Sequence, residues 1–173
     1  MEFGREKKIN DILNPIDSIE DTIYKYDVDF LRDTPNDLSI RFKGLWDSYN
    51  VNFSWDEFNE IIEISSNLRI SKEKKVNNNI LSLLSLVNKK VSLGFFDFCN
   101  QSQSIFFNYK VSVKGIKILS GEQIEDFIDV VTSECDRFFP VFYVFLKKKQ
   151  DPNYALKAAL FETYGEAWMN HFC

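Results

Sequence analysis

The chain has 173 residues, of which 45% are hydrophobic, and it carries a formal net charge of −5. This length allows one substantial core and is short for two ordinary domains. The acidic balance argues against nucleic-acid binding through the overall field, because phosphate binding usually requires a basic face. We therefore expect residues 1–13 to form a flexible N-terminal arm and residues 14–173 to form a single domain.

No apolar run approaches the roughly 20 residues that span a bilayer, and the start, MEFGREKKIN, lacks the apolar region of a signal peptide. The three cysteines, Cys99, Cys135 and Cys173, are far apart and form no CxxC pair. Their number and spacing favour free thiols in a reducing compartment. The sequence therefore predicts a cytoplasmic protein with no membrane partner.

A short helix is predicted to begin after Asn14. Asn14 is a favoured N-cap residue, and Pro15 suits the first helical position. Ile16, Ile19 and Ile23 follow at helical spacing and supply one apolar face. This helix should end near residue 25.

The next segment predicts three strands that each have one solvent-facing side, because apolar and polar residues alternate. The apolar positions are Leu38, Ile40 and Phe42, then Tyr49, Val51, Phe53 and Trp55, then Ile62, Ile64 and Leu68. Short turns between them favour an antiparallel meander. The segment around Phe30 either adds another strand or closes the first helix onto the sheet.

The stretch 71–113 contains the densest apolar run of the chain. Residues 71–91 predict a helix with Ser71 as its N-cap and one apolar stripe. Residues 92–99 and 104–113 are rich in aromatic and β-branched side chains, which predicts two strands joined by a turn.

The last third of the chain predicts helices. Ser120 and Gln123 have the spacing of a capping box, and a long amphipathic pattern follows them. We expect Pro140 to kink this helix or to break it into two, and a final helix to begin at residues 151–152. The element order, one helix, three or four strands, a helix, two strands and then helices, predicts an α+β fold. In this fold the helices pack on one antiparallel sheet of about five to six strands.

Several blocks of the sequence resemble the YbjN family of bacterial sensory transduction regulators, and more narrowly its alphaproteobacterial branch. These blocks are 14–17 (NPID), 46–55 (WDSYNVNFSW), 83–98 (LLSLVNKKVSLGFFDF), 121–129 (GEQIEDFID), 134–140 (ECDRFFP) and 162–167 (ETYGEA). The resemblance implies a fold like that of type III secretion chaperones. It also implies a non-enzymatic regulatory or chaperone-like module that binds a protein partner and forms a homodimer, with no catalytic residue and no cofactor to transfer.

The alternative function is a small-ligand or metal-dependent enzyme that uses an acidic helix face. Glu122, Glu125, Asp126 and Asp129 lie at helical offsets that could present oxygen ligands or a carboxylate pair. We favour a solvated acidic face near a helix N-terminus.

Other reactive residue types are sparse. The one histidine, His171, lies close to the C-terminus, and neither Cys99 nor Cys135 has metal-ligand spacing. Asp97 lies between two phenylalanines. We interpret it as a carboxylate at the edge of the sheet rather than as a catalytic acid. We predict no catalytic residue, no metal ligand and no cofactor.

The strand pair at 93–109 is apolar at successive positions, with Phe95 beside Phe96 and Phe106 beside Phe107. Both faces of this part of the sheet therefore need cover. We predict that Phe95, Phe106 and Phe107 contribute to a dimer or partner interface. The alternative is that the C-terminal helices fold over them.

Overall fold

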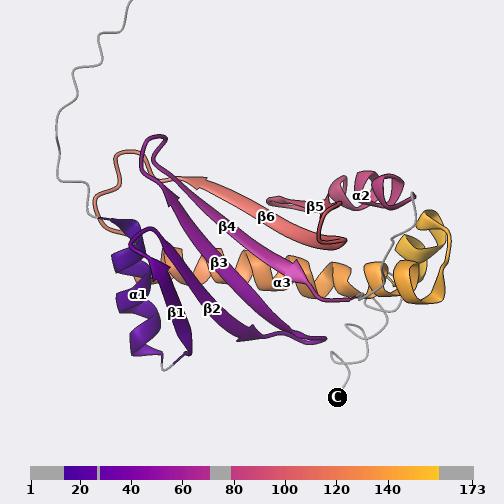
Figure 1. Cartoon of the computed structure of the whole chain (residues 1–173), viewed down its shortest axis with the longest axis horizontal. Coiled ribbons are helices and arrows are strands. Elements are labelled where there is room, and N and C mark those ends of the chain that lie inside the picture. The colour runs from indigo at the N-terminus through magenta and orange to yellow at the C-terminus, as the bar shows by residue number, and fades with distance from the viewer. Residues whose placement is uncertain (1–13, 27, 71–78, 160–173) are drawn as a thin grey trace, which may run out of the picture.

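The computed structural model describes residues 14–26, 28–70 and 79–159 (Figure 1). Its elements are α1 (Pro15–Lys25), β1 (Phe30–Thr34), β2 (Asp37–Lys43), β3 (Ser48–Asp56), β4 (Ile61–Leu68), α2 (Ile80–Asn88), β5 (Phe95–Cys99), β6 (Ser104–Ser112) and α3 (Gly121–Lys148). A further helix covers residues 152–159. The strands form one six-stranded antiparallel sheet in the order β1-β2-β3-β4-β6-β5. The predicted α+β fold is confirmed, and the segment around Phe30 is a strand.

The sheet has one covered face. Every second residue of β2, β3 and β4 points toward the helices, so that Leu38, Phe53 and Ile64 stand side by side in neighbouring strands and are buried. Figure 1 shows α3 running across the back of the sheet, with α1 at the β1 end and α2 beside β5. The buried faces of all three helices belong to the same hydrophobic core as these strand residues.

Asn14 begins α1 and also fixes its position. Its Oδ1 accepts a hydrogen bond from the Ile16 N–H at 2.9 Å, which is the predicted N-cap. Its Nδ2 donates to the Pro35 carbonyl at 2.8 Å and to Asn36 Oδ1 at 2.9 Å, in the β1–β2 turn. One side chain therefore starts the helix and ties it to the sheet.

The helix α3 is continuous from Gly121 to Lys148. Its predicted capping box is confirmed: the Ser120 N–H donates to Gln123 Oε1 at 3.0 Å, and the Gln123 N–H donates to Ser120 Oγ at 3.2 Å. The break allowed at Pro140 is wrong. Phe138 and Phe142 are buried on either side of the proline, and their packing offsets the roughly 3 kcal/mol that an interior proline costs.

Two predicted helices are described only in part. The helix α2 covers Ile80–Asn88, and the predicted start at Ser71 lies outside the described residues. The final helix is described over residues 152–159, and its predicted end also lies outside them. Asp151 caps its start, because Asp151 Oδ1 accepts hydrogen bonds from the N–H groups of Asn153 at 2.9 Å and Tyr154 at 3.3 Å.

Two acidic side chains in the middle of α3 hold loops of the sheet layer. Asp136 accepts hydrogen bonds from the Tyr49 hydroxyl at 2.7 Å and from the Leu45 N–H at 2.9 Å, which fixes the β2–β3 loop. Glu134 Oε1 accepts one from the Ser92 N–H at 3.0 Å, which fixes the loop between α2 and β5. The block 134–140 therefore holds two loops of the sheet layer against α3.

Candidate functional site

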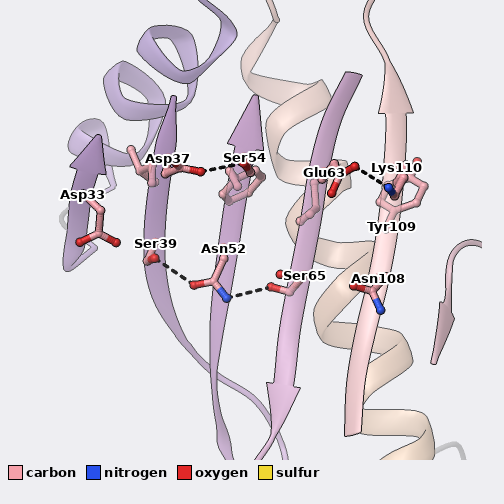
Figure 2. A pocket seen from close by; sticks show the side chains of 13 residues that line it. Asp33, Asp37, Ser39, Asn52, Ser54, Glu63, Ser65, Asn108, Tyr109 and Lys110 are labelled. Carbon is pink, nitrogen blue, oxygen red and sulfur yellow. Dashed lines mark hydrogen bonds and ion pairs between the residues drawn. The ribbon is translucent and has the colours of Figure 1, made fainter. Parts of the chain in front are cut away.

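The sheet face that points away from the helices is open in the described part of the chain, and polar side chains cross it in rows. Ser39, Asn52, Ser65 and Asn108 stand opposite one another on β2, β3, β4 and β6. The Ser39 hydroxyl donates to Asn52 Oδ1 at 2.9 Å, and Asn52 Nδ2 donates to the Ser65 carbonyl at 3.5 Å. Figure 2 shows this row on the near side of the strands, with α3 behind them.

A second row runs parallel to the first and contains charged residues. Asp37, Ser54, Glu63 and Lys110 stand opposite one another in the same four strands. Glu63 and Lys110 form an ion pair, and the Ser54 hydroxyl donates to Asp37 Oδ1 at 2.6 Å. The hydrogen bonds from Ser54 and Thr34 hold the pKa of Asp37 below its usual value. Lys110 therefore neutralises Glu63, whereas Asp37 is held by neutral hydroxyl donors and leaves the row with a net negative charge.

The two rows line a shallow hollow of about 410 Å³. Most of the residues that line it have hydroxyl, amide or carboxylate side chains, and they lie on β2, β3, β4 and β6, with Asp33 on β1 (Figure 2). A rigid sheet presents these groups at fixed spacing, so they can recognise a complementary polar surface. We call the surface formed by these two rows, together with Phe95 and Phe106 beside them, the open face.

The open face ends in apolar side chains on β5 and β6. Phe95 stands opposite Asn108 and is 42% exposed, and Phe106 is half-buried. Phe107 points the other way and is 0% exposed, with its ring centroid 5.0 Å from that of Phe96. Of the three residues predicted to form an interface, Phe107 is therefore in the core beneath the helices, and the open face carries Phe95 and Phe106.

The four acidic residues in the first three turns of α3 are exposed. These residues are Glu122, Glu125, Asp126 and Asp129. Hydrogen bonds from the Glu122 backbone and the Ser120 side chain lower the pKa of Glu122. The Tyr26 hydroxyl donates to Glu125, and this hydrogen bond raises the pKa of Tyr26. Within residues 14–26, 28–70 and 79–159, no group of three or more His, Cys, Asp or Glu side chains could hold a metal ion.

The structure also places the other reactive side chains of the described residues. Asp97 is exposed, and its Oδ1 accepts a hydrogen bond from the Phe98 N–H at 2.7 Å. Cys135 is buried, and burial raises the pKa of its thiol. Cys99 is half-buried on the edge strand, and hydrogen bonds from Ser102 lower its pKa. The predictions for His171 and Cys173 concern residues outside the described part of the chain.

The helices of the described part were also compared with the length and hydropathy that a membrane span requires. None of them is both long enough and apolar enough to cross a bilayer.

Helices on one face of a six-stranded antiparallel sheet, with the other face open, define a class of small α+β protein. Within that class the chain belongs to the YbjN family. The family model, described as "Putative bacterial sensory transduction regulator", matches residues 15–143. The family resemblance in the sequence is confirmed, and its alphaproteobacterial branch stays a prediction.

One solved structure with a similar fold is described as "Crystal structure of YbjN, a putative transcription regulator from E. coli". It is 14% identical to this chain, with a TM-score of 0.49, and the match covers 72% of this chain and 87% of that chain. No curated protein matches the sequence.

Sequence reasoning predicted a wet face on three strands but did not single out its polar rows as a site. The signal was present, because Ser39, Asn52 and Ser65 occupy the polar positions of the alternating pattern. Serine and asparagine are also common at the solvent-facing positions of ordinary strands, so their presence alone does not indicate a site. Only the strand register shows that they form one continuous row.

Proposed function

We propose that the protein is a non-enzymatic regulatory module that binds another protein through its open face. The observation that carries this proposal is the asymmetry of the sheet: helices cover one face, while the other displays ordered polar rows that end at Phe95 and Phe106. The family's description as a regulator supports a binding role. A cytoplasmic location belongs to the same proposal and rests on the free cysteines.

The chemistry of the open face favours a particular kind of partner segment. Serine and asparagine side chains each offer a donor and an acceptor, so they suit hydroxyl and amide groups. Glu63 is already paired with Lys110, and the remaining negative charge of the row, on Asp37, disfavours an acidic segment. We therefore propose an uncharged polar segment with an apolar residue that packs on Phe95 and Phe106.

Paired variants test the proposal. The intact protein and the double variant Phe95→Ser/Phe106→Ser serve as bait for cross-linking and capture from source cells. Phe58→Ser is the matched control, because Phe58 is exposed on the β3–β4 turn, at the opposite end of β4 from Phe106. We expect one partner that the wild type and Phe58→Ser both retain and the double variant loses, although all three are folded at the temperature of the capture.

A partner held equally well by the double variant would contradict the proposal. The enzyme alternative has its own test, which is a thermal-shift screen against divalent cations and nucleotides. A ligand that binds the folded state raises the melting temperature, by an amount set by its concentration relative to Kd. A specific rise that is lost in Glu122→Gln/Asp126→Asn would favour the enzyme and overturn the non-enzymatic assignment.

A further inference from the structure

An apolar crevice lies between α1, β2 and the first turns of α3, on the helix side of the molecule. It encloses about 280 Å³. The side chains of Ile23, Val28, Ile40, Phe42, Ile124 and Ile128 line it. This volume is slightly below the range of ordinary small-molecule pockets, and the crevice fits one or two apolar side chains better than a cofactor.

Two carboxylates stand at the rim of this crevice. Glu125 and Asp129 are one helical turn apart on α3, and both are exposed. The Tyr26 hydroxyl reaches over from the end of α1 and donates to Glu125. Asp129 forms no ion pair with another described residue. An occupant should therefore combine an apolar side chain with a neighbouring cation.

The same chain displays a segment with this chemistry in the loop between β6 and α3. Ile116 and Ile118 are 38% and 65% exposed, and the exposed Lys117 lies between them. Lys117 also forms no ion pair within the described part of the chain. Two isoleucines held in solvent beside an unpaired lysine are the complement of the crevice and its rim.

The loop is held in shape before any contact is made. Its two ends are anchored by the buried side chains of Val113 and Leu119. Between them the Ile116 N–H donates to the Val113 carbonyl at 2.9 Å, in a turn where Gly115 has a φ of +78°. A preorganised loop loses little conformational entropy on binding, so its apolar side chains can contribute to affinity.

We propose that the crevice is a subunit interface that receives the 116–118 loop of a second copy of this chain. Lys117 of each copy then faces Asp129 of the other, and Ile116 or Ile118 enters the apolar crevice. This contact goes beyond partner binding through the open face and uses none of its residues. It gives the expected homodimer a defined contact.

The positions of loop and crevice suit a two-fold pairing. Tyr26 lines both the crevice and a neighbouring hollow that Ile118 also lines, so loop and crevice are adjacent on the surface. Adjacent complementary patches can pair reciprocally about a two-fold axis, which doubles each contact and closes the assembly at two copies. The exposed ring of Tyr26 borders the same region and extends the contact area.

Charge exchange tests the contact. Sedimentation equilibrium over a dilution series is measured for the wild type, Lys117→Glu, Asp129→Lys and the double variant Lys117→Glu/Asp129→Lys. We expect a wild-type dimer, a dimer Kd raised at least about tenfold in each single variant, and recovery in the double variant, because the charge pair is restored with its signs exchanged. Lys157→Glu, the same charge change on the exposed side of the 152–159 helix, should leave Kd unchanged.

A wild type that stays monomeric at its highest soluble concentration would overturn the inference. So would a dimer that is indifferent to both single exchanges, or a double variant no tighter than either. Lys117, Asp129 and Lys157 are all exposed, and an unchanged melting temperature shows that each charge variant folds. Phe95→Ser/Phe106→Ser serves as a further arm and should keep the dimer. The two proposals can therefore fail independently: loss of this contact does not affect the open-face proposal, and failure of the open-face proposal does not affect this contact.

Discussion

The side-chain amide of Asn88 closes the outer edge of the sheet at Phe96. Asn88 Oδ1 accepts a hydrogen bond from the Phe96 N–H at 2.8 Å, and Asn88 Nδ2 donates to the Phe96 carbonyl at 2.9 Å. These two bonds replace those that a neighbouring strand would make. The next outward N–H of β5, that of Phe98, donates to Asp97 at 2.7 Å. The edge strand β5 is thus protected against pairing with another chain.

Asn88→Leu should open this edge. The variant removes both hydrogen bonds and leaves the Phe96 backbone groups free, so we expect a loss of about 1 to 2 kcal/mol in the free energy of unfolding. We also expect concentration-dependent aggregation, because an apolar edge strand with free backbone groups templates strand pairing. Urea unfolding and static light scattering measure the two effects. Asn153→Leu, an exposed asparagine on another helix, is the control, and equal behaviour of the two variants would refute the edge role.

Adjacent phenylalanines on β6 should lose very different amounts of stability on the same substitution. Phe107 is fully buried against Phe96, and Phe106 is half-buried on the open face. Removing a buried phenylalanine ring costs about 3 to 5 kcal/mol, which is a large part of a typical domain's 5 to 15 kcal/mol. Phe107→Ser should therefore be largely unfolded or strongly destabilised, whereas Phe106→Ser should lose about 1 kcal/mol or less. Circular dichroism during urea unfolding measures both, and similar losses would show that the assigned faces are wrong.

The buried hydroxyl of Tyr49 should make the protein sensitive to alkali. Burial and the hydrogen bond to Asp136 raise the pKa of Tyr49 above the usual tyrosine value of 10.0. Below pH 10 the tyrosine is protonated in both the folded and the unfolded state. Above it the unfolded state releases the proton first, so stability falls as pH rises, by up to about 1.4 kcal/mol per pH unit.

Tyr49→Phe isolates this contribution. The variant should lose about 1 kcal/mol at neutral pH, because Asp136 loses a donor. Between pH 10 and 11, however, its stability should fall less steeply than that of the wild type. Burial also raises the pKa of Cys135, but that thiol is common to both proteins and cancels in the comparison. The free energy of unfolding of both proteins is measured by urea unfolding at each pH. An equally steep fall in the wild type and in Tyr49→Phe would exclude a contribution from Tyr49 titration.

Features that depend on neighbouring residues in the sequence could be predicted. Asn14 before Pro15 correctly marked the start of α1, and Ser120 with Gln123 marked that of α3, because a cap is chemistry within three or four residues. Alternation likewise placed β2, β3 and β4 within a residue or two of their observed ends. These elements need no information from the rest of the fold.

Features that depend on partners distant in the sequence could not be predicted. Two consecutive phenylalanines, such as Phe106 and Phe107, must point to opposite faces, but only the register with β4 and β5 decides which face the helices cover. Asn88 looks like an ordinary polar residue at a helix end until β5 is placed beside it. Continuity through Pro140 likewise depends on how Phe138 and Phe142 pack in the core.

Replacement of Gly44 should destabilise the protein, because a side chain there would collide with two neighbouring residues. A Cβ at this position would lie 2.2 Å from Tyr49 Cε2 and 2.6 Å from Asp136 Oδ1. Both neighbours are fixed by their mutual hydrogen bond, so Gly44→Ala should displace the β2–β3 loop from α3 and cost about 1 to 3 kcal/mol. Gly121→Ala is the matched control, because its Cβ would meet nothing within 4 Å and alanine favours a helix. Urea unfolding should place Gly44→Ala below the wild type and Gly121→Ala at or above it, and the reverse order would mean that the loop does not rest on this contact.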